Sequence, residues 1–338
     1  EKALDLVGYD DLRERQAALR EEGRYLGVGL SSYIEVCGGG ADKVQGGSVR
    51  MLPSGTVFAA SAQVENGQGH VTSFAQIVAD ELGVAVDDVE VVTGDSERVP
   101  EGGGTGGSKA IAMGGNALKV SAAKVRERAR AIAAARLEAA PEDLEFEDGA
   151  FHVAGAPDRA VSIQALAELS HVGEDLPDDL ADGLEAEEFY DPANLCYAFG
   201  AHVAVVEVDP GSGELEFHEY VAVDDCGVQI NPKLVEGQLH GGIAQGIGDA
   251  IYERAVYDEG GTLVSGSFQD YAMPKAMHMP ELEVGDTVTP CPHNPTGAKG
   301  VGESGTMGAP PAVVNAAVDA VRPLGVRSLE MPLTPESV

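Results

Sequence analysis

The chain has 338 residues, among them 56 acidic and 22 basic ones, which gives a formal net charge of −34. A field of this sign repels nucleic acids and anionic membranes, so neither is expected as a partner. No apolar run approaches the roughly 18 residues of a membrane span and no signal peptide is visible, so we expect a cytoplasmic protein.

The charge also bears on the environment of the protein. Acidic residues are spread through most of the chain, and their mutual repulsion destabilises a compact fold in dilute salt. At about 1 M salt the Debye length falls to about 3 Å, which screens this repulsion. The simplest interpretation is a protein from a high-salt cytoplasm, and an ordinary acidic protein is the alternative.

The first half is expected to contain a helix, a hairpin and a second helix. Residues 9–22 have helical apolar spacing, and residues 49–52 and 56–64 read as paired strands. Gly67-Gln68-Gly69-His70 then opens a helix that ends at Gly83. Gln68 and His70 are thus expected at a strand-to-helix turn with free backbone N–H groups; a ligand contact and a purely structural turn are equally open.

A second glycine-rich turn, residues 102–108, precedes a long Ala-rich helix that runs to about residue 137. It matches G-x-G-x-x-G in letters, but no strand comes directly before it and no acid stands on a second strand. We therefore reject a dinucleotide-binding fold. The physical expectation that remains is close approach of a ligand to bare backbone, with an anion favoured at the helix start.

The second half repeats part of this order. A hairpin is expected at residues 199–208 and 214–224, and Gly237-Gln238-Leu239-His240 is expected to open an apolar helix. The pattern predicts an α+β fold of two similar mixed α/β subdomains. The expected limits are residues 1–170 and 196–338, separated by an acidic linker or excursion at residues 171–195.

A carboxylate between glycines marks the last candidate site. Glu303 stands in Lys299-Gly300-Val301-Gly302-Glu303, ahead of an apolar helix in which Pro310 and Pro311 suit the first turn. A lone acid on a dry, backbone-lined loop is a candidate general base. The alternative is an acid that only stabilises the helix dipole.

The cysteines and histidines give no metal site. Cys37, Cys196, Cys226 and Cys291 stand far apart without a C-x-x-C, so neither a zinc nor an iron–sulfur site is expected. H-E-x-x-H and G-x-S-x-G are also missing from the sequence. No side chain is therefore predicted as a metal ligand.

Six short segments follow one another along the chain: G-Q-G-H (67–70), G-T-G-G-S (104–108), D-D-C-G (224–227), V-E-G-Q (235–238), D-Y-A-M-P (270–274) and K-G-V-G-E (299–303). Together they resemble the large, molybdopterin-binding subunit of the xanthine dehydrogenase superfamily. Their order across nearly the whole chain is similar to the C-terminal part of that subunit in aerobic carbon monoxide dehydrogenases. Val71 departs from the pattern, because many relatives carry an acid there.

The resemblance implies a molybdopterin cofactor, in its cytosine dinucleotide form, whose dithiolene holds molybdenum. The residues that would line the cofactor are Gln68, Gly69, His70, Gly106, Gly107, Ser108, Cys226, Gln238, Lys299 and Gly302. It also implies that Glu303 is the base in the oxidation of a small substrate with oxygen derived from water.

The implied partners are the upstream half of the large subunit together with iron–sulfur and FAD subunits, in a dimer of heterotrimers. The substrate is left open between carbon monoxide, an aldehyde and an N-heterocycle, and so is the presence of copper, because the family's substrate-facing loops lie upstream. The second hypothesis is a fragment that binds cofactor or partner subunits without turnover.

Overall fold

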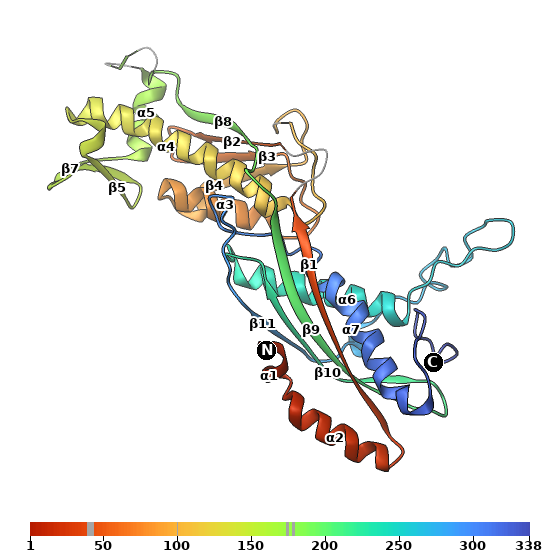
Figure 1. The fold of residues 1–338 in the computed structure, drawn as a ribbon. Coiled ribbons are helices and arrows are strands. Elements are labelled where there is room, and N and C mark those ends of the chain that lie inside the picture. Colours follow the sequence, from red (N-terminus) through yellow and green to blue (C-terminus); the bar gives the residue numbers. More distant parts are fainter. Residues whose placement is uncertain (39–43, 100, 174–175, 178–179) are drawn as a thin grey trace.

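The structure is a computed structural model that describes residues 1–38, 44–99, 101–173, 176–177 and 180–338. Two lobes are joined by two long strands, β1 (Tyr25–Cys37) and β9 (Cys196–Val208) (Figure 1). These strands pair antiparallel along their full length, from Tyr25 opposite Val208 to Cys37 opposite Cys196. The chain therefore begins in one lobe, crosses to the other and returns along its own first strand.

The first lobe is built on a four-stranded sheet, in the order β1-β9-β10-β11, with helices on both faces. Successive residues of β9 point to opposite faces of the sheet, so Val203 and Val205 pack in one apolar core and Ala204 and Val206 in the other. One core holds the N-terminal helices and the other holds α6 and α7. The other helices and strands of this lobe are α1 (Lys2–Leu6), α2 (Tyr9–Glu21), β10 (Leu215–Asp225), α6 (Pro232–Ile251), η5 (Ala276–His278), β11 (Leu282–Asp286), α7 (Ser304–Val321) and η6 (Arg322–Leu324).

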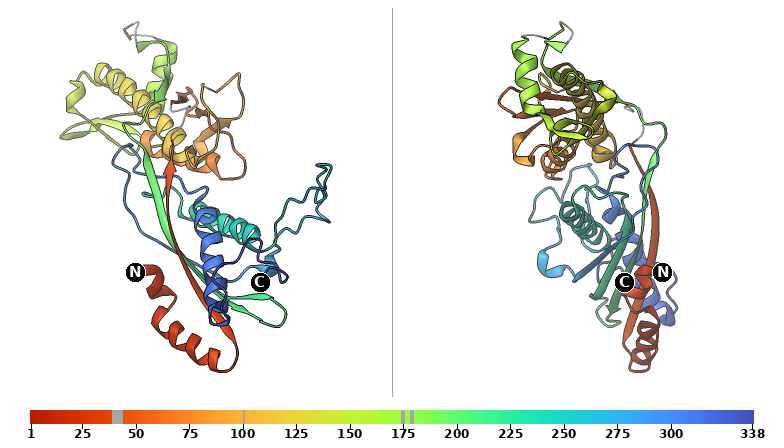
Figure 2. Two further views of the ribbon diagram at one scale, coloured as in Figure 1. Left: turned by 45° about the vertical axis from the view of Figure 1, so that its right-hand side comes forward. Right: turned by 90° about the vertical axis from the view of Figure 1, so that its left-hand side faces the viewer.

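The second lobe has a sheet in the order β4-β3-β2-β8, packed on α3 and α4, and a smaller sheet in the order β5-β6-β7. Figure 2 shows this lobe beyond the ends of the long strands in two further views. Its elements are β2 (Gln45–Met51), β3 (Val57–Ser61), α3 (His70–Leu82), η1 (Val86–Asp88), β4 (Val89–Thr93), the π-helix η2 (Ala110–Gly115), α4 (Asn116–Leu137), η3 (Pro141–Asp143), β5 (Leu144–Glu147), β6 (Ala150–Val153), β7 (Ala156–Ser162), α5 (Ile163–Val172) and β8 (Leu184–Tyr190).

The predicted α+β class with two mixed lobes is confirmed. The expected limits at residues 170 and 196 omit one feature, since β1, from the N-terminal part of the chain, belongs to the same sheet of the first lobe as β9, β10 and β11. Residues 174–175 and 178–179 of the expected acidic linker lie outside the described residues. The linker at residues 171–195 thus stays a prediction.

Two expected helix starts are wrong, because both helices begin earlier in the chain. The cause is a capping residue in one helix and tertiary packing in the other. Helix α6 begins at Pro232, because the side chain of Asn231 caps it by accepting the Leu234 N–H at 3.1 Å. The second G-Q-x-H segment therefore lies inside a helix, whereas residues 67–69 precede α3, so the two segments are not equivalent.

Helix α7 begins at Ser304, which leaves Pro310 and Pro311 inside the helix instead of in its first turn. Its early turns pack closely on α6: a Cβ at Gly305 would lie 2.5 Å from the backbone nitrogen of Ile243. This tertiary contact extends the helix beyond what the prolines suggest.

A disulfide joins Cys196, the first residue of β9, to Cys291 in the loop that leads to Lys299. Its two Cα atoms are 6.1 Å apart, and the residues are 95 positions apart in sequence.

Within the described parts of the chain no helix is long and apolar enough to cross a membrane.

Candidate cofactor-binding site

A cavity of about 300 Å³ lies where the two lobes meet. One wall comes from residues 66–73 and 105–111 of the second lobe and the other from residues 226–238 and 298–303 of the first. The structure brings Glu303 into this one cavity together with nearly all the predicted cofactor contacts. Those that line it are Gln68, His70, Gly106, Gly107, Ser108, Cys226, Gln238, Lys299 and Gly302.

Gly69 does not line the cavity, but it shapes the turn before α3. The turn is organised by Glu65, which the sequence analysis did not identify. The Glu65 carboxylate accepts the backbone N–H groups of Gly67 at 2.7 Å, Gly69 at 3.2 Å and Val71 at 3.1 Å. Three N–H groups of this turn are therefore bound within the protein and are not free for a ligand.

The two polar side chains of the turn face the cavity with different roles. The side-chain oxygen of Gln68 accepts the Asn66 N–H at 2.7 Å, which leaves its amide NH₂ as the donor for a ligand. His70 is buried and stacks on Phe74. Burial lowers the pKa of His70 more than nearby Glu65 raises it, so the imidazole is neutral at pH 7.

The glycine-rich loop reaches across the cavity to the Glu303 loop. Ser108 adopts a left-handed backbone with φ 48°, and its Oγ accepts the Glu303 N–H at 3.1 Å. The same hydroxyl lies 3.5 Å from Glu303 Oε2. A Cβ at Gly300 would lie 1.6 Å from the carbonyl oxygen of Ser108, so glycine is required for this contact.

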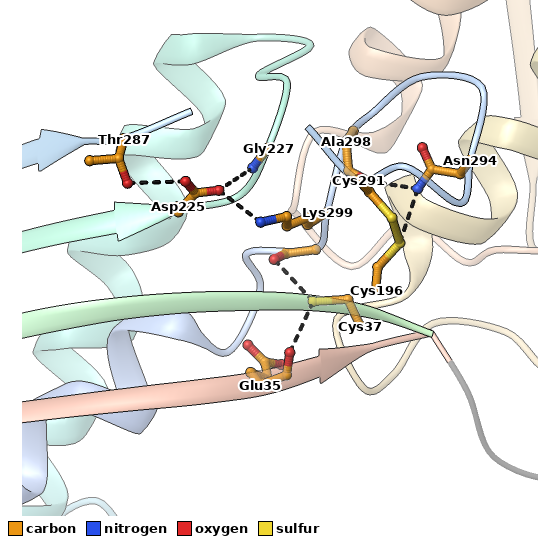
Figure 3. Close-up of polar contacts among 11 residues, drawn as sticks. Glu35, Cys37, Cys196, Asp225, Gly227, Thr287, Cys291, Asn294, Ala298 and Lys299 are labelled. Atoms are coloured by element: carbon orange, nitrogen blue, oxygen red, sulfur yellow. Dashed lines mark hydrogen bonds and ion pairs between the residues drawn. A yellow bond between two sulfur atoms is a disulfide. The ribbon is translucent and has the colours of Figure 1, made fainter. Parts of the chain in front are cut away.

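Lys299 is fixed beneath the cavity by a buried ion pair (Figure 3). Its Nζ lies 2.9 Å from Asp225 Oδ1 and 4.7 Å from the centre of the Phe199 ring. Asp225 also accepts the Gly227 N–H and the Thr287 hydroxyl, both at 3.0 Å. Burial raises the pKa of the Asp225 carboxyl, but these partners outweigh it and lower that pKa overall.

Cys226 follows Asp225 and is buried. Burial and the charges of Asp225 and Asp224 raise the pKa of its thiol to about 12. The thiol therefore stays protonated at pH 7 and is unsuited to be a thiolate ligand. The described residues contain no group of three or more His, Cys, Asp or Glu side chains placed to hold a metal ion.

Glu303 is the N-cap residue of α7, and its side chain is exposed to the cavity. The expected dry surroundings are not present around it in this chain. Its position at the start of a helix, together with the hydroxyl of Ser108, suits an accessible carboxylate.

The cavity fits a ligand that has polar edges and approaches backbone. A Cβ at Gly106 would meet no protein atom within 4 Å, so no contact within the protein requires glycine there. A ligand that lies against the backbone would require glycine at this position. His70 Nδ1 is buried without a hydrogen-bond partner among the described residues. Lys109, a buried cation that the sequence analysis did not select, also lines the cavity. Pterin and phosphate groups have the edges and the charge that such donors recognise.

The chain is similar to known molybdopterin-dependent proteins. Residues 2–280 match the family model described as "Molybdopterin cofactor-binding domain". The chain is 38% identical to the carbon monoxide dehydrogenase large chain of Afipia carboxidovorans, over 98% of this chain and 42% of that one. It is 36% identical to the nicotine 6-hydroxylase large subunit of Paenarthrobacter nicotinovorans, over 99% of this chain and 42% of that one.

A solved structure of reconstituted carbon monoxide dehydrogenase from Oligotropha carboxidovorans has the same fold, with a TM-score of 0.94 and 38% identity, over 99% of this chain and 43% of that one. The chain thus spans less than half the length of the relatives that it matches. The family model covers most of the 338 residues. The chain belongs to the molybdopterin cofactor-binding domain family, with carbon monoxide dehydrogenase large chains among its relatives.

Proposed function

We propose that the chain forms the molybdenum-cofactor-binding portion of the large subunit of a molybdenum hydroxylase or carbon monoxide dehydrogenase. The observation that carries this proposal is the shared cavity, which joins Glu303 with Gln68, Ser108 and Gln238 from two lobes. When bound, the molybdenum cofactor would supply the two-electron oxidant for a small substrate. The cytosine dinucleotide form belongs to this proposal.

The residues of this chain would hold the cofactor in two ways. The bare backbone at Gly106 and Gly107 would allow a planar group to approach closely, and the Gln68 amide would donate to its edge. Lys109 would face phosphate, since a cation in the wall of so acidic a protein favours an anion. Lys299 would act through its position, because its ammonium group is bound to Asp225.

Glu303 would act as the general base. Its Oε2 atom would take up a proton as oxygen derived from water passes to the substrate. The Ser108 hydroxyl is close enough to steady this carboxylate. The relatives' names include carbon monoxide and nicotine, so we propose a small molecule without choosing between carbon monoxide, an aldehyde and an N-heterocycle.

The proposed partners follow the same family pattern: the remaining part of a large subunit, and subunits that carry iron–sulfur clusters and FAD. A relative is itself named as subunit gamma of a dehydrogenase complex. Electrons would leave the substrate through these subunits in a dimer of heterotrimers.

The test is Glu303→Gln in the assembled enzyme, with Glu259→Gln, an exposed acid outside the cavity, as the matched control. The Glu303 variant keeps size but removes the base, so turnover should fall about 10² to 10⁴-fold. Molybdenum and pterin content should stay at the wild-type level in both variants. Full turnover of the Glu303 variant with full cofactor would refute the base, and loss of cofactor would make this glutamate structural. An assembled enzyme that holds cofactor but oxidises no small substrate would support the alternative, a binding portion without turnover.

A further inference from the structure

A second carboxyl group, Glu35 of β1, lies behind the cavity. Glu35 is only 7% exposed, and neither Oε1 nor Oε2 has a hydrogen-bond partner among the described residues. An ionised carboxylate that is buried without partners is strongly disfavoured. The group is therefore expected to carry a proton, which makes it a donor.

The polar groups next to Glu35 come from the two loops that meet at Glu303. Burial raises the pKa of Glu35; the hydroxyls of Ser108 and Ser304 lower it, and the charge of Glu303 raises it again. Ser304 Oγ is likewise buried with no hydrogen-bond partner in the described part of the chain. Glu35 and Ser304 thus place three unpartnered polar atoms beside the proposed base.

Two titratable neighbours of Glu35 on its own strand stay neutral. Tyr33 and Cys37 lie on the same strand, and Glu35 acts on both electrostatically. Burial raises the pKa of the Tyr33 hydroxyl. Burial also raises the pKa of the Cys37 thiol to about 11, although hydrogen bonds with neighbouring backbone groups lower it. Strand β9 contributes Ala198 opposite Glu35, and the nearby Lys299 ammonium is bound to Asp225 (Figure 3).

We propose that Glu35 is a positioning residue for Glu303 in the assembled enzyme: as a neutral acid whose O–H has no partner among the described residues, it is placed to donate to the Glu303 carboxylate, directly or through the hydroxyl of Ser304 or Ser108. The inference rests on Glu303 being the base of the proposed function. A hydrogen bond to the ionised form favours that form. Glu35 would therefore hold the Glu303 carboxylate as a hydrogen-bond acceptor that is turned toward the cavity.

The test compares Glu35→Gln with Glu35→Ala in the assembled enzyme. Gln still donates an N–H to Glu303, whereas Ala donates nothing. In the Ala variant the acid limb of the kcat–pH profile should move up by about one pH unit or more, a loss of about tenfold on that limb, and Gln should restore it. Wild-type profiles in both variants, or equal shifts in both, would overturn the proposal, because a role in packing alone does not depend on the donor.

The matched control is Glu81→Gln. Glu81 is also buried, but it pairs with Lys119 at 2.9 Å and Arg126 at 2.8 Å, and it does not line the cavity. Its replacement should lower the melting temperature and leave the pH profile unchanged. A shifted profile in this control would show that the effect follows from lost stability and would overturn the proposal.

An infrared measurement separates this proposal from the proposed function, since it needs no turnover. The carbonyl stretch of a protonated carboxylic acid should be present near neutral pH and disappear in Glu35→Gln. It should persist in Glu303→Gln and Glu81→Gln. If Glu303 proves not to be the base, the band still reports the proton on Glu35. If the spectrum of Glu35→Gln has the same carboxylic acid band as the wild type, Glu35 carries no proton and the proposal is refuted.

Discussion

The two walls of the cavity are each organised by one carboxylate, and the two carboxylates are held differently. Asp225 is 1% exposed and binds the Lys299 ammonium, a backbone N–H and a hydroxyl. Glu65 is partly exposed and binds three backbone N–H groups of its own turn. One wall is thus fixed by a long-range charge pair and the other by a local turn, so the two should respond differently to the loss of charge.

The largest effect on stability is expected from Lys299→Met. It leaves Asp225 buried without its cation, which typically costs about 3–5 kcal/mol. Thermal unfolding measures it, and Lys299→Met with Asp225→Asn should recover part of the loss. The matched control is Arg24→Met, which breaks the ion pair with Glu207 on the surface and should change the melting temperature little. A Lys299 variant as stable as wild type would remove the distinction between the walls.

A smaller effect is expected from Glu65→Gln, about 1–3 kcal/mol, because the turn loses acceptors for its N–H groups. Burial raises the pKa of Glu65, but these hydrogen bonds lower it overall. The stabilisation of the fold by the Glu65 carboxylate is therefore present above the unfolded-state pKa and is lost as the pH falls through the lowered folded-state pKa. Stability should thus depend less on acid pH in the variant. An unchanged slope between about pH 5 and pH 2 would contradict this role for Glu65.

Added salt should stabilise the protein by screening its surface charges and should change the contribution of the buried Lys299–Asp225 pair little. With a formal charge of −34, the melting temperature should rise between about 0.1 M and 2 M KCl as repulsion is screened. The deficit of Lys299→Met should persist in both salts, because buried pairs are screened much less. A flat or falling melting temperature would reject the proposed high-salt origin.

Local features of the fold could be predicted from the sequence. Gly83 was expected to end a helix, and it ends α3 in a left-handed conformation with φ 62°. The hairpin of β9 and β10 was expected because Pro210-Gly211-Ser212-Gly213 separates two strand-like runs. Such signals are carried by neighbouring residues, so the sequence shows them directly.

Contacts between distant residues could not be predicted in this way. Lys299 and Asp225 are 74 positions apart, and the charge of Glu303 acts on Glu35 only because β1 packs against α7. Glu65 offered one signal, an acid two residues before the first glycine of its turn. The motifs indicated which residues gather at the cavity, whereas their partners follow from the packing of the lobes.

The cofactor content of Gly106→Val tests most directly whether the cavity between the lobes is the molybdenum-cofactor site. Gly266→Val is the control, because Gly266 is also exposed without a positive φ and does not line the cavity. A Cβ at Gly106 meets no protein atom within 4 Å, so the valine side chain would extend into the space proposed for the ligand. Overpacking of about 1.4 kcal/mol or more weakens binding about tenfold. Molybdenum and pterin per assembled enzyme should fall in Gly106→Val and stay at the wild-type level in Gly266→Val, with both melting temperatures unchanged in cofactor-free protein. Full molybdenum and pterin in Gly106→Val would contradict the assignment of this cavity.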